Sequence, residues 1–226
     1  MGSGKFEEVL AEFRLVLSGG SNLVDAIIPP LLFVMMSAFL GFDYAMWGSL
    51  GVALLIMAHR WRKGESLWHA LGGVGGVGLA ILLAQFFDRA EAYFLPGIIT
   101  GALTVIVAVI SNIVGRPMVA WSSSLTRRWP LGWYWHPQIR PAYSEVTWLW
   151  ALYFALRLLL QLALFQIEAP NLLAIFNLIS GWPATIALLV ASYLYGTWRL
   201  RNLKGPSVDE FKTGAPPPWE GQQRGF

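Results

Sequence analysis

Residues 146–167 read VTWLWALYFALRLLLQLALFQI, an apolar run with one charged residue, Arg157. A helix that crosses the hydrocarbon core of a bilayer needs about 20 mostly apolar residues, so this run predicts a membrane-spanning helix. The whole chain shares its character, because 56% of the 226 residues are hydrophobic and only 13% are charged. Soluble domains carry roughly 25% charged residues. The composition therefore predicts an integral membrane protein.

Further apolar runs predict an all-α, polytopic membrane protein with about six transmembrane helices. Besides 146–167, the runs lie at about 22–42, 44–58, 67–87, 93–114 and 171–199. The last run is longer than one crossing requires and is interrupted by Ser180-Gly181-Trp182-Pro183, so we expect a broken helix that crosses mainly in 182–199. We assign residues 21–200 to this six-span membrane domain.

The two ends and one loop differ from the spans. Residues 1–20 predict an amphipathic interfacial helix without a signal peptide, because apolar side chains between 5 and 17 recur at helical spacing opposite charged ones. Residues 201–226 are rich in Pro and Gly, which predicts a disordered cytoplasmic tail. The Trp-rich loop at 129–136 is expected to lie on the bilayer surface.

The distribution of basic residues predicts the orientation. Fourteen of the sixteen Lys and Arg residues fall in both termini and in alternate loops, one (Arg89) falls on the opposite side, and Arg157 lies within a span. Cytoplasmic loops hold the excess of positive charge. We therefore expect both termini to be cytoplasmic.

Arg157 is the most informative residue, because a charged side chain inside the hydrocarbon usually faces a partner or a wet cavity. Asp25 is the only carboxylate expected to approach it from the same side. Pro29 and Pro30 leave carbonyl groups near Asp25 without helical donors. With Gln161, one turn beyond Arg157, these residues are our structural or ligand-binding candidates.

Three interpretations of Arg157 stay open. It forms an ion pair with Asp25 that joins the first and fifth spans, it holds an anion or a lipid phosphate, or it takes part in proton relay or transport. Small residues four apart, at Gly72 and Gly76 and at Gly97 and Gly101, favour close packing of the third span on the fourth. A hinge is the alternative for these glycines.

No catalytic pattern stands out. The chain has no cysteine, and none of its three histidines has another histidine three or four residues away, so we expect neither a metal nor another cofactor. The serine run at 122–124 lacks the context of a nucleophile elbow. Topology explains the basic residues, so nothing favours nucleic-acid binding. We do not expect an enzyme.

Four segments carry a family resemblance: VDAIIPPLLFV at 24–34, FLPG at 94–97, RP at 116–117 and TWLWALYFALRLLLQ at 147–161. Together they resemble a bacterial membrane family common in actinobacteria, domain of unknown function 3159, which is loosely similar to intracellular septation protein A. The resemblance covers roughly residues 20–200. It implies a protein of the cell envelope or of division, without an established activity or ligand, and it assigns no functional residue.

Two functions follow as hypotheses. The first is a non-enzymatic inner-membrane protein that acts through lipid or protein contacts, with a membrane-protein partner bound by the N-terminal helix or the C-terminal tail. The second is a small secondary carrier, or a lipid- or anion-binding protein, that uses Arg157 and the broken helices.

Overall fold

The computed structural model describes residues 35–36, 39–62, 67–222 and 225–226, and these residues form helices and turns without a strand. The predicted interfacial helix, Asp25, Pro29 and Pro30 lie outside the described residues, as does most of the first predicted span. Four described helical segments are long and apolar enough to cross a membrane: Phe42–His59, Ala90–Ile113, Arg140–Gln166 and Pro170–Leu203. A shorter apolar helix covers Val74–Phe86. The chain is thus an all-α polytopic membrane protein.

The chain divides into two compact units, each described here by itself. Unit 1 comprises Met1–Pro96 and Leu164–Trp182, and unit 2 comprises Gly97–Ala163 and Pro183–Phe226. The described helices of unit 1 are α3 (Phe42–Arg62), α4 (Leu67–Phe86), the 3₁₀ helix η1 (Ala90–Phe94) and α9 (Pro170–Ser180). Those centred in unit 2 are α5 (Leu95–Ile113), α6 (Met118–Arg127), α7 (Leu131–Tyr134), α8 (Arg140–Gln166), α10 (Trp182–Leu203) and α11 (Val208–Thr213).

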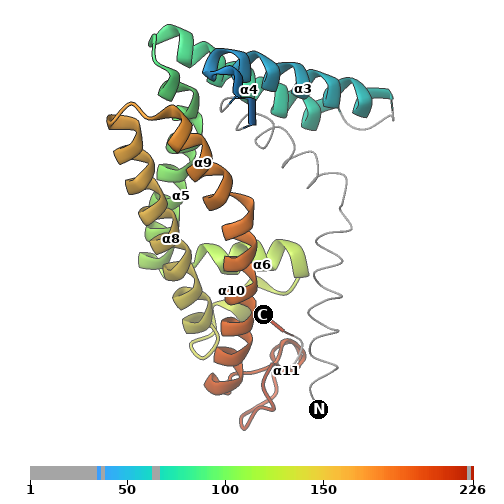
Figure 1. The fold of residues 1–226 in the computed structure, drawn as a ribbon. Helices are drawn as coiled ribbons and strands as arrows, with labels where there is room; N and C mark the ends of the chain where they lie inside the picture. Colours follow the sequence, from blue (N-terminus) through green and yellow to red (C-terminus); the bar gives the residue numbers. More distant parts are fainter. Residues whose placement is uncertain (1–34, 37–38, 63–66, 223–224) are drawn as a thin grey trace. The chain divides into compact units, whose positions relative to one another are not determined.

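Unit 1 packs through small and flexible side chains. Helices α3 and α4 lie side by side (Figure 1). Their core consists of Ala45, Met46, Ile81, Ala84 and Ala174, all at most 6% exposed. Such residues let helix backbones approach closely inside a bilayer, where lipid tails are as apolar as the side chains.

The predicted break in the last span is confirmed. Helix α9 ends at Ser180 and α10 begins at Trp182. A Cβ atom on Gly181 would lie 2.6 Å from the carbonyl oxygen of Asn177, so this backbone turn requires glycine. Pro183 follows, and because it has no amide hydrogen it cannot donate to the preceding turn.

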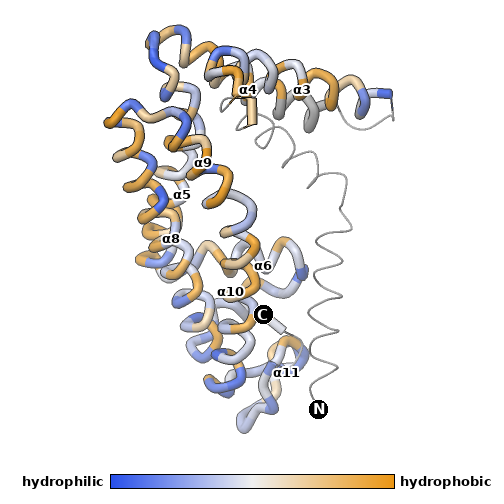
Figure 2. Tube along the Cα trace, in the orientation of Figure 1, coloured by the Kyte–Doolittle hydropathy of each residue, from blue (hydrophilic) through white to orange (hydrophobic). Residues whose placement is uncertain are grey.

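Helix α8 starts earlier than predicted. It begins at Arg140, six residues before the predicted start, and ends at Gln166. Pro141 is tolerated there because a first helical turn needs no donor from its own amide groups. The additional residues of the helix include Tyr143 and Glu145, which precede the apolar run. Figure 2 shows orange predominating along the later half of α8, whereas blue residues gather at the end of α10 and around α11.

The Trp-rich loop forms the centre of a protein core, and its predicted place on the bilayer surface stays a prediction. Trp133, Tyr134 and Tyr143 are fully buried, and their rings pack edge to face with centroids 4.9–6.1 Å apart. We call this part of unit 2 the platform. Its buried residues are Ala120, Trp133, Tyr134, Ile139, Ala142, Tyr143, Val146, Leu200, Val208 and Phe226. Burial raises the pKa of the Tyr134 phenol.

The C-terminal tail also differs from the disordered segment predicted. Ser207 caps α11 by accepting a hydrogen bond from the Glu210 amide, and the Glu210 carboxylate accepts one from the Ser207 amide. Phe226 stacks on Tyr143 with ring centroids 4.3 Å apart. The prediction relied on the Pro- and Gly-rich composition and did not weigh apolar residues such as Val208 and Phe226. Their burial offsets the entropic cost of ordering the tail.

Candidate functional site

The structure describes only some of the predicted site residues. Arg157 lies in α8 and is half-buried, and Gln161, one turn further on, is 2% exposed. The suggested pairing of Arg157 with Asp25 stays a prediction, since Asp25, Pro29 and Pro30 fall outside the described part of the chain. Burial of a mid-span glutamine amide fits a polar group that takes part in contacts within the protein.

The glycine predictions have different outcomes. A Cβ atom on Gly101 would lie 3.9 Å from Oε1 of Gln161, so α5 and α8 approach each other at this level. Among the described residues, no atom lies within 4 Å of a Cβ atom built on Gly76 or Gly97. Gly72 lies in α4, in a part of that helix where side-chain surroundings are not described. Packing of α4 on α5 through these glycines stays a prediction.

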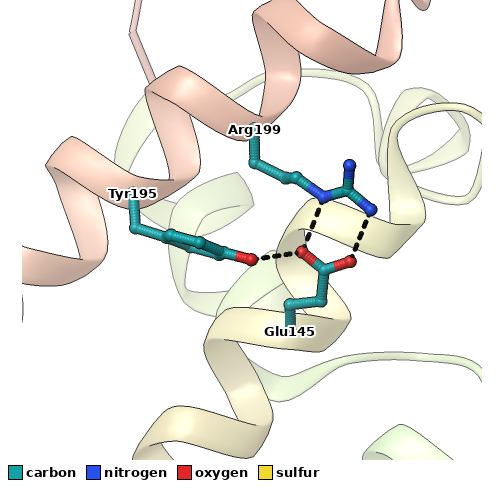
Figure 3. Close-up of polar contacts among 3 residues, drawn as sticks. All are labelled: Glu145, Tyr195 and Arg199. Atoms are coloured by element: carbon teal, nitrogen blue, oxygen red, sulfur yellow. Dashed lines mark hydrogen bonds and ion pairs between the residues drawn. The ribbon is translucent and has the colours of Figure 1, made fainter.

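Sequence reasoning missed the main polar cluster of unit 2, which joins α8 to α10. The Arg199 guanidinium donates to both carboxylate oxygens of Glu145, with Nε–Oε2 at 2.7 Å and Nη2–Oε1 at 2.8 Å (Figure 3). The Tyr195 hydroxyl donates to the same Oε2 at 2.7 Å. A forked, charge-assisted contact of this kind fixes both position and orientation.

A signal for this cluster was present in the sequence. Glu145 is the only acidic residue between Glu91 and Glu168, and it precedes a long apolar run. Such a carboxylate needs a cation at its own depth. The predicted topology already placed Arg199 on the same side of the membrane, so its pairing with Glu145 could have been inferred from the sequence.

Neutral hydrogen bonds hold the remaining helices of unit 2. The Asn112 side-chain amide donates to the Ser144 carbonyl at 2.9 Å, and the Ser144 hydroxyl donates back to Asn112 Oδ1 at 2.8 Å. The Trp150 indole donates to the Ser192 hydroxyl at 2.9 Å. The Trp133 indole donates to the Pro206 carbonyl at 2.8 Å, which ties the tail to α7. These contacts connect α5, α8, α10 and the tail.

Unit 1 carries a separate charged cluster. Arg89 Nη2 lies 3.1 Å from Glu168 Oε1, and Arg89 Nε lies 3.9 Å from Glu91 Oε2. The guanidinium carbon of Arg89 lies 5.2 Å from the ring centroid of Phe165. In the same unit the hydroxyls of Ser49 and Tyr93 are 3.2 Å apart. Each of these groups bonds within the unit, an arrangement suited to holding helices together.

These residues are suited to binding and to holding the helices together. Within the described ranges, no three His, Cys, Asp or Glu side chains lie close enough together to hold a metal ion. The carboxylate of Glu145 has both oxygens occupied by donors. The sequence signals that the structure does bring together are Gly101 with Gln161, and the Trp-rich loop with the tail.

Comparison with known proteins identifies the family. A family model described as "Protein of unknown function (DUF3159)" matches residues 17–201. No curated protein and no solved structure matches the chain. The matched residues run from before the first predicted span almost to the end of α10. The chain therefore belongs to the DUF3159 family.

Proposed function

We propose that the protein is a non-enzymatic membrane protein of the bacterial cell envelope that acts through contacts with proteins or lipids. The observation that carries this proposal is the platform, where α6, α7, α11 and the ends of α8 and α10 enclose an aromatic core. A packed structure that is anchored to membrane helices offers a rigid surface to a partner. A role like that of septation protein A, in the inner membrane with both termini cytoplasmic, is part of the proposal.

The polar clusters support a role in cohesion. The strongest, Glu145 with Arg199 and Tyr195, closes on itself with three short hydrogen bonds. A carboxylate used in general acid–base chemistry needs a free position beside the substrate. Glu145 instead fixes α8 to α10, next to Val146 and Leu200 of the platform.

Photo-cross-linking in native membranes tests the proposal. A photoreactive amino acid replaces Lys212 or Thr213, both exposed on α11, and in a control it replaces the exposed Leu159 of α8. We expect discrete protein or lipid adducts from the α11 positions and a different pattern from position 159. Identical patterns at all three positions would count against the platform as a contact surface.

A small carrier is the second candidate, favoured by the helix break at Gly181 and by Arg157 within α8. Interrupted helices often line the sites of transporters. Liposomes containing the wild-type chain or Arg157→Gln, with proton and chloride fluxes followed under an imposed potential, separate the two functions. The scaffold proposal expects both preparations to match empty liposomes, whereas a wild-type flux that Arg157→Gln abolishes would support the carrier.

A further inference from the structure

The depth of α6 in unit 2 is fixed by its contacts. Helix α6 runs across the direction of α8 and α10 (Figure 1). The amide of Val119 in α6 donates to Thr147 Oγ1 at 3.3 Å. The α5 segment that is long enough to span ends at Ile113, just before α6 begins. Helix α6 therefore lies level with residue 147 of α8, where the apolar part of α8 begins.

A group of exposed aromatic residues marks the same level. Trp121 on α6, Trp148 on α8 and Trp198 on α10 are 44%, 48% and 56% exposed. Exposed tryptophans gather where the hydrocarbon core of a bilayer meets the lipid headgroups. A helix that lies across the spans at this level is placed like an interfacial helix. We therefore take the level of α6 as the headgroup region of unit 2.

Two arginines lie at the turn between α5 and α6. Gly115 has a φ of +75°, and a Cβ atom there would lie 3.2 Å from Nη1 of Arg140, so the Arg140 guanidinium rests against the bare backbone of Gly115. Arg116 follows directly, and its guanidinium carbon lies 4.9 Å from the ring centroid of Trp135. Both arginines are exposed. This turn presents two positively charged groups that are held in place.

The surrounding segment supplies no negative charge. Residues 115–144 contain four arginines and no Asp or Glu. The next acid along the chain, Glu145, is engaged by Arg199 and Tyr195. Two guanidinium groups in an acid-free segment at headgroup depth attract anions, and guanidinium matches the geometry of phosphate oxygens.

An exposed apolar stripe leads along α5 to this turn. Its members recur three or four residues apart, as expected for one face of a helix. They are Ile99, Leu103, Ile106, Val107, Ile110, Ile113 and Val114, each between 51% and 74% exposed. A chain of hydrocarbon fits against such a face.

We propose that Arg140, which lies against Gly115, and Arg116, the next residue after that glycine, bind the phosphate of an anionic phospholipid whose acyl chains lie along the α5 stripe. The inference rests on the proposed function and specifies its lipid contact. The positive pair selects a headgroup with net negative charge, because a zwitterionic headgroup carries a compensating cation. Trp121, whose ring centroid lies 5.8 Å from that of Trp135, borders the site beside the glycerol region.

Native mass spectrometry of the full-length chain in detergent tests the inference. Phosphatidylglycerol and phosphatidylcholine are titrated separately into wild type, into R116Q/R140Q and into the control R128Q/R201Q. The control removes the same charge from two other exposed arginines of unit 2. We expect R116Q/R140Q to lose about tenfold or more in phosphatidylglycerol affinity, as for two lost charge-assisted contacts, and the control to lose less than about threefold. Phosphatidylcholine affinity should stay unchanged in every variant.

Three results would overturn the inference. The first is an unchanged phosphatidylglycerol affinity in R116Q/R140Q. The second is an equal loss of affinity in R128Q/R201Q, which would indicate diffuse attraction. The third is competition by millimolar inorganic phosphate that equals competition by the lipid, which would indicate a site for free phosphate. Thermal unfolding of each variant verifies that the fold is intact, and R116K/R140K provides a second variant that keeps the charge. Failure here leaves the proposed function standing, since the α11 cross-linking and the liposome fluxes depend on neither arginine.

Discussion

The core of unit 1 and the platform of unit 2 are built from opposite kinds of side chain. Unit 1 packs Ala45, Ala84 and Ala174 around Met46 and Ile81. The platform buries three large aromatic side chains, Trp133, Tyr134 and Tyr143, with no exposed surface. Inside a bilayer the lipid is as apolar as the protein, so close approach of small residues drives packing. Outside the hydrocarbon, water drives large rings inward.

This difference predicts that loss of a platform ring has the largest effect on stability. Trp133→Ala removes a fully buried ring and leaves the Pro206 carbonyl without its indole donor. We expect it to lower the free energy of unfolding by about 3–5 kcal/mol. Reversible denaturation of the chain in detergent measures the change.

The exposed Trp61 of α3 provides the matched control, because Trp61→Ala removes the same side chain from a position that is 66% exposed. We expect a change within about 0.5 kcal/mol for this variant. Equal losses for the two variants would show that the platform is not a packed core.

The polar cluster that joins α8 to α10 should have an intermediate effect. The side chains of Glu145 and Arg199 are 34% and 31% exposed, so solvent weakens their attraction. We expect a double-mutant cycle of Glu145→Gln and Arg199→Gln to show a favourable coupling that is smaller than the loss at Trp133. Additive changes in the free energy of unfolding would mean that the fork does not contribute to stability.

The core of unit 1 should respond less to a small deletion. Ile81→Val removes one methylene group from a side chain that is 4% exposed, and we expect a loss of about 0.5–1.5 kcal/mol. Ile179→Val makes the identical change at a position in α9 that is 64% exposed. A loss at position 179 as large as at position 81 would show that the exposed face of α9 is packed as tightly as the core.

Much of the fold was predictable because membrane spans have a simple sequence signature. The predicted span at 67–87 agrees with α4 at Leu67–Phe86, and the break near Gly181 follows from Gly and Pro in an overlong apolar run. The platform was not predictable in this way. Trp133 and Trp148 look alike in sequence, yet the first is fully buried and the second is half exposed. Tertiary contacts with Pro206 and the tail determine the burial of Trp133.

The candidate site shows the same limit. Glu145 and Arg199 are 54 residues apart, and no local pattern joins them. Arg116 stood out only through the RP motif at 116–117 and the count of basic residues. Arg140 lies against Gly115, the residue before Arg116, although Arg140 and Gly115 are 25 residues apart in the chain, and no local pattern shows this tertiary contact.

The smallest expected effect concerns pH and the tail, where the platform meets water. Hydrogen bonds from the amides of Glu220 and Ser207 lower the pKa of the Glu210 carboxyl below its ordinary value. Because the pKa is lower in the folded state, the stabilisation is fully present above the unfolded value of about 4.3 and is lost as the pH falls through the folded pKa. We therefore expect the protection of α11 amides from hydrogen exchange, corrected for intrinsic rates, to decrease below about pH 4.3, whereas Glu210→Gln shows weaker protection without this decrease. Equal pH dependence in both proteins would assign the effect to another group, and unchanged protection in Glu210→Gln at neutral pH would show that the capping box does not hold the tail against the platform.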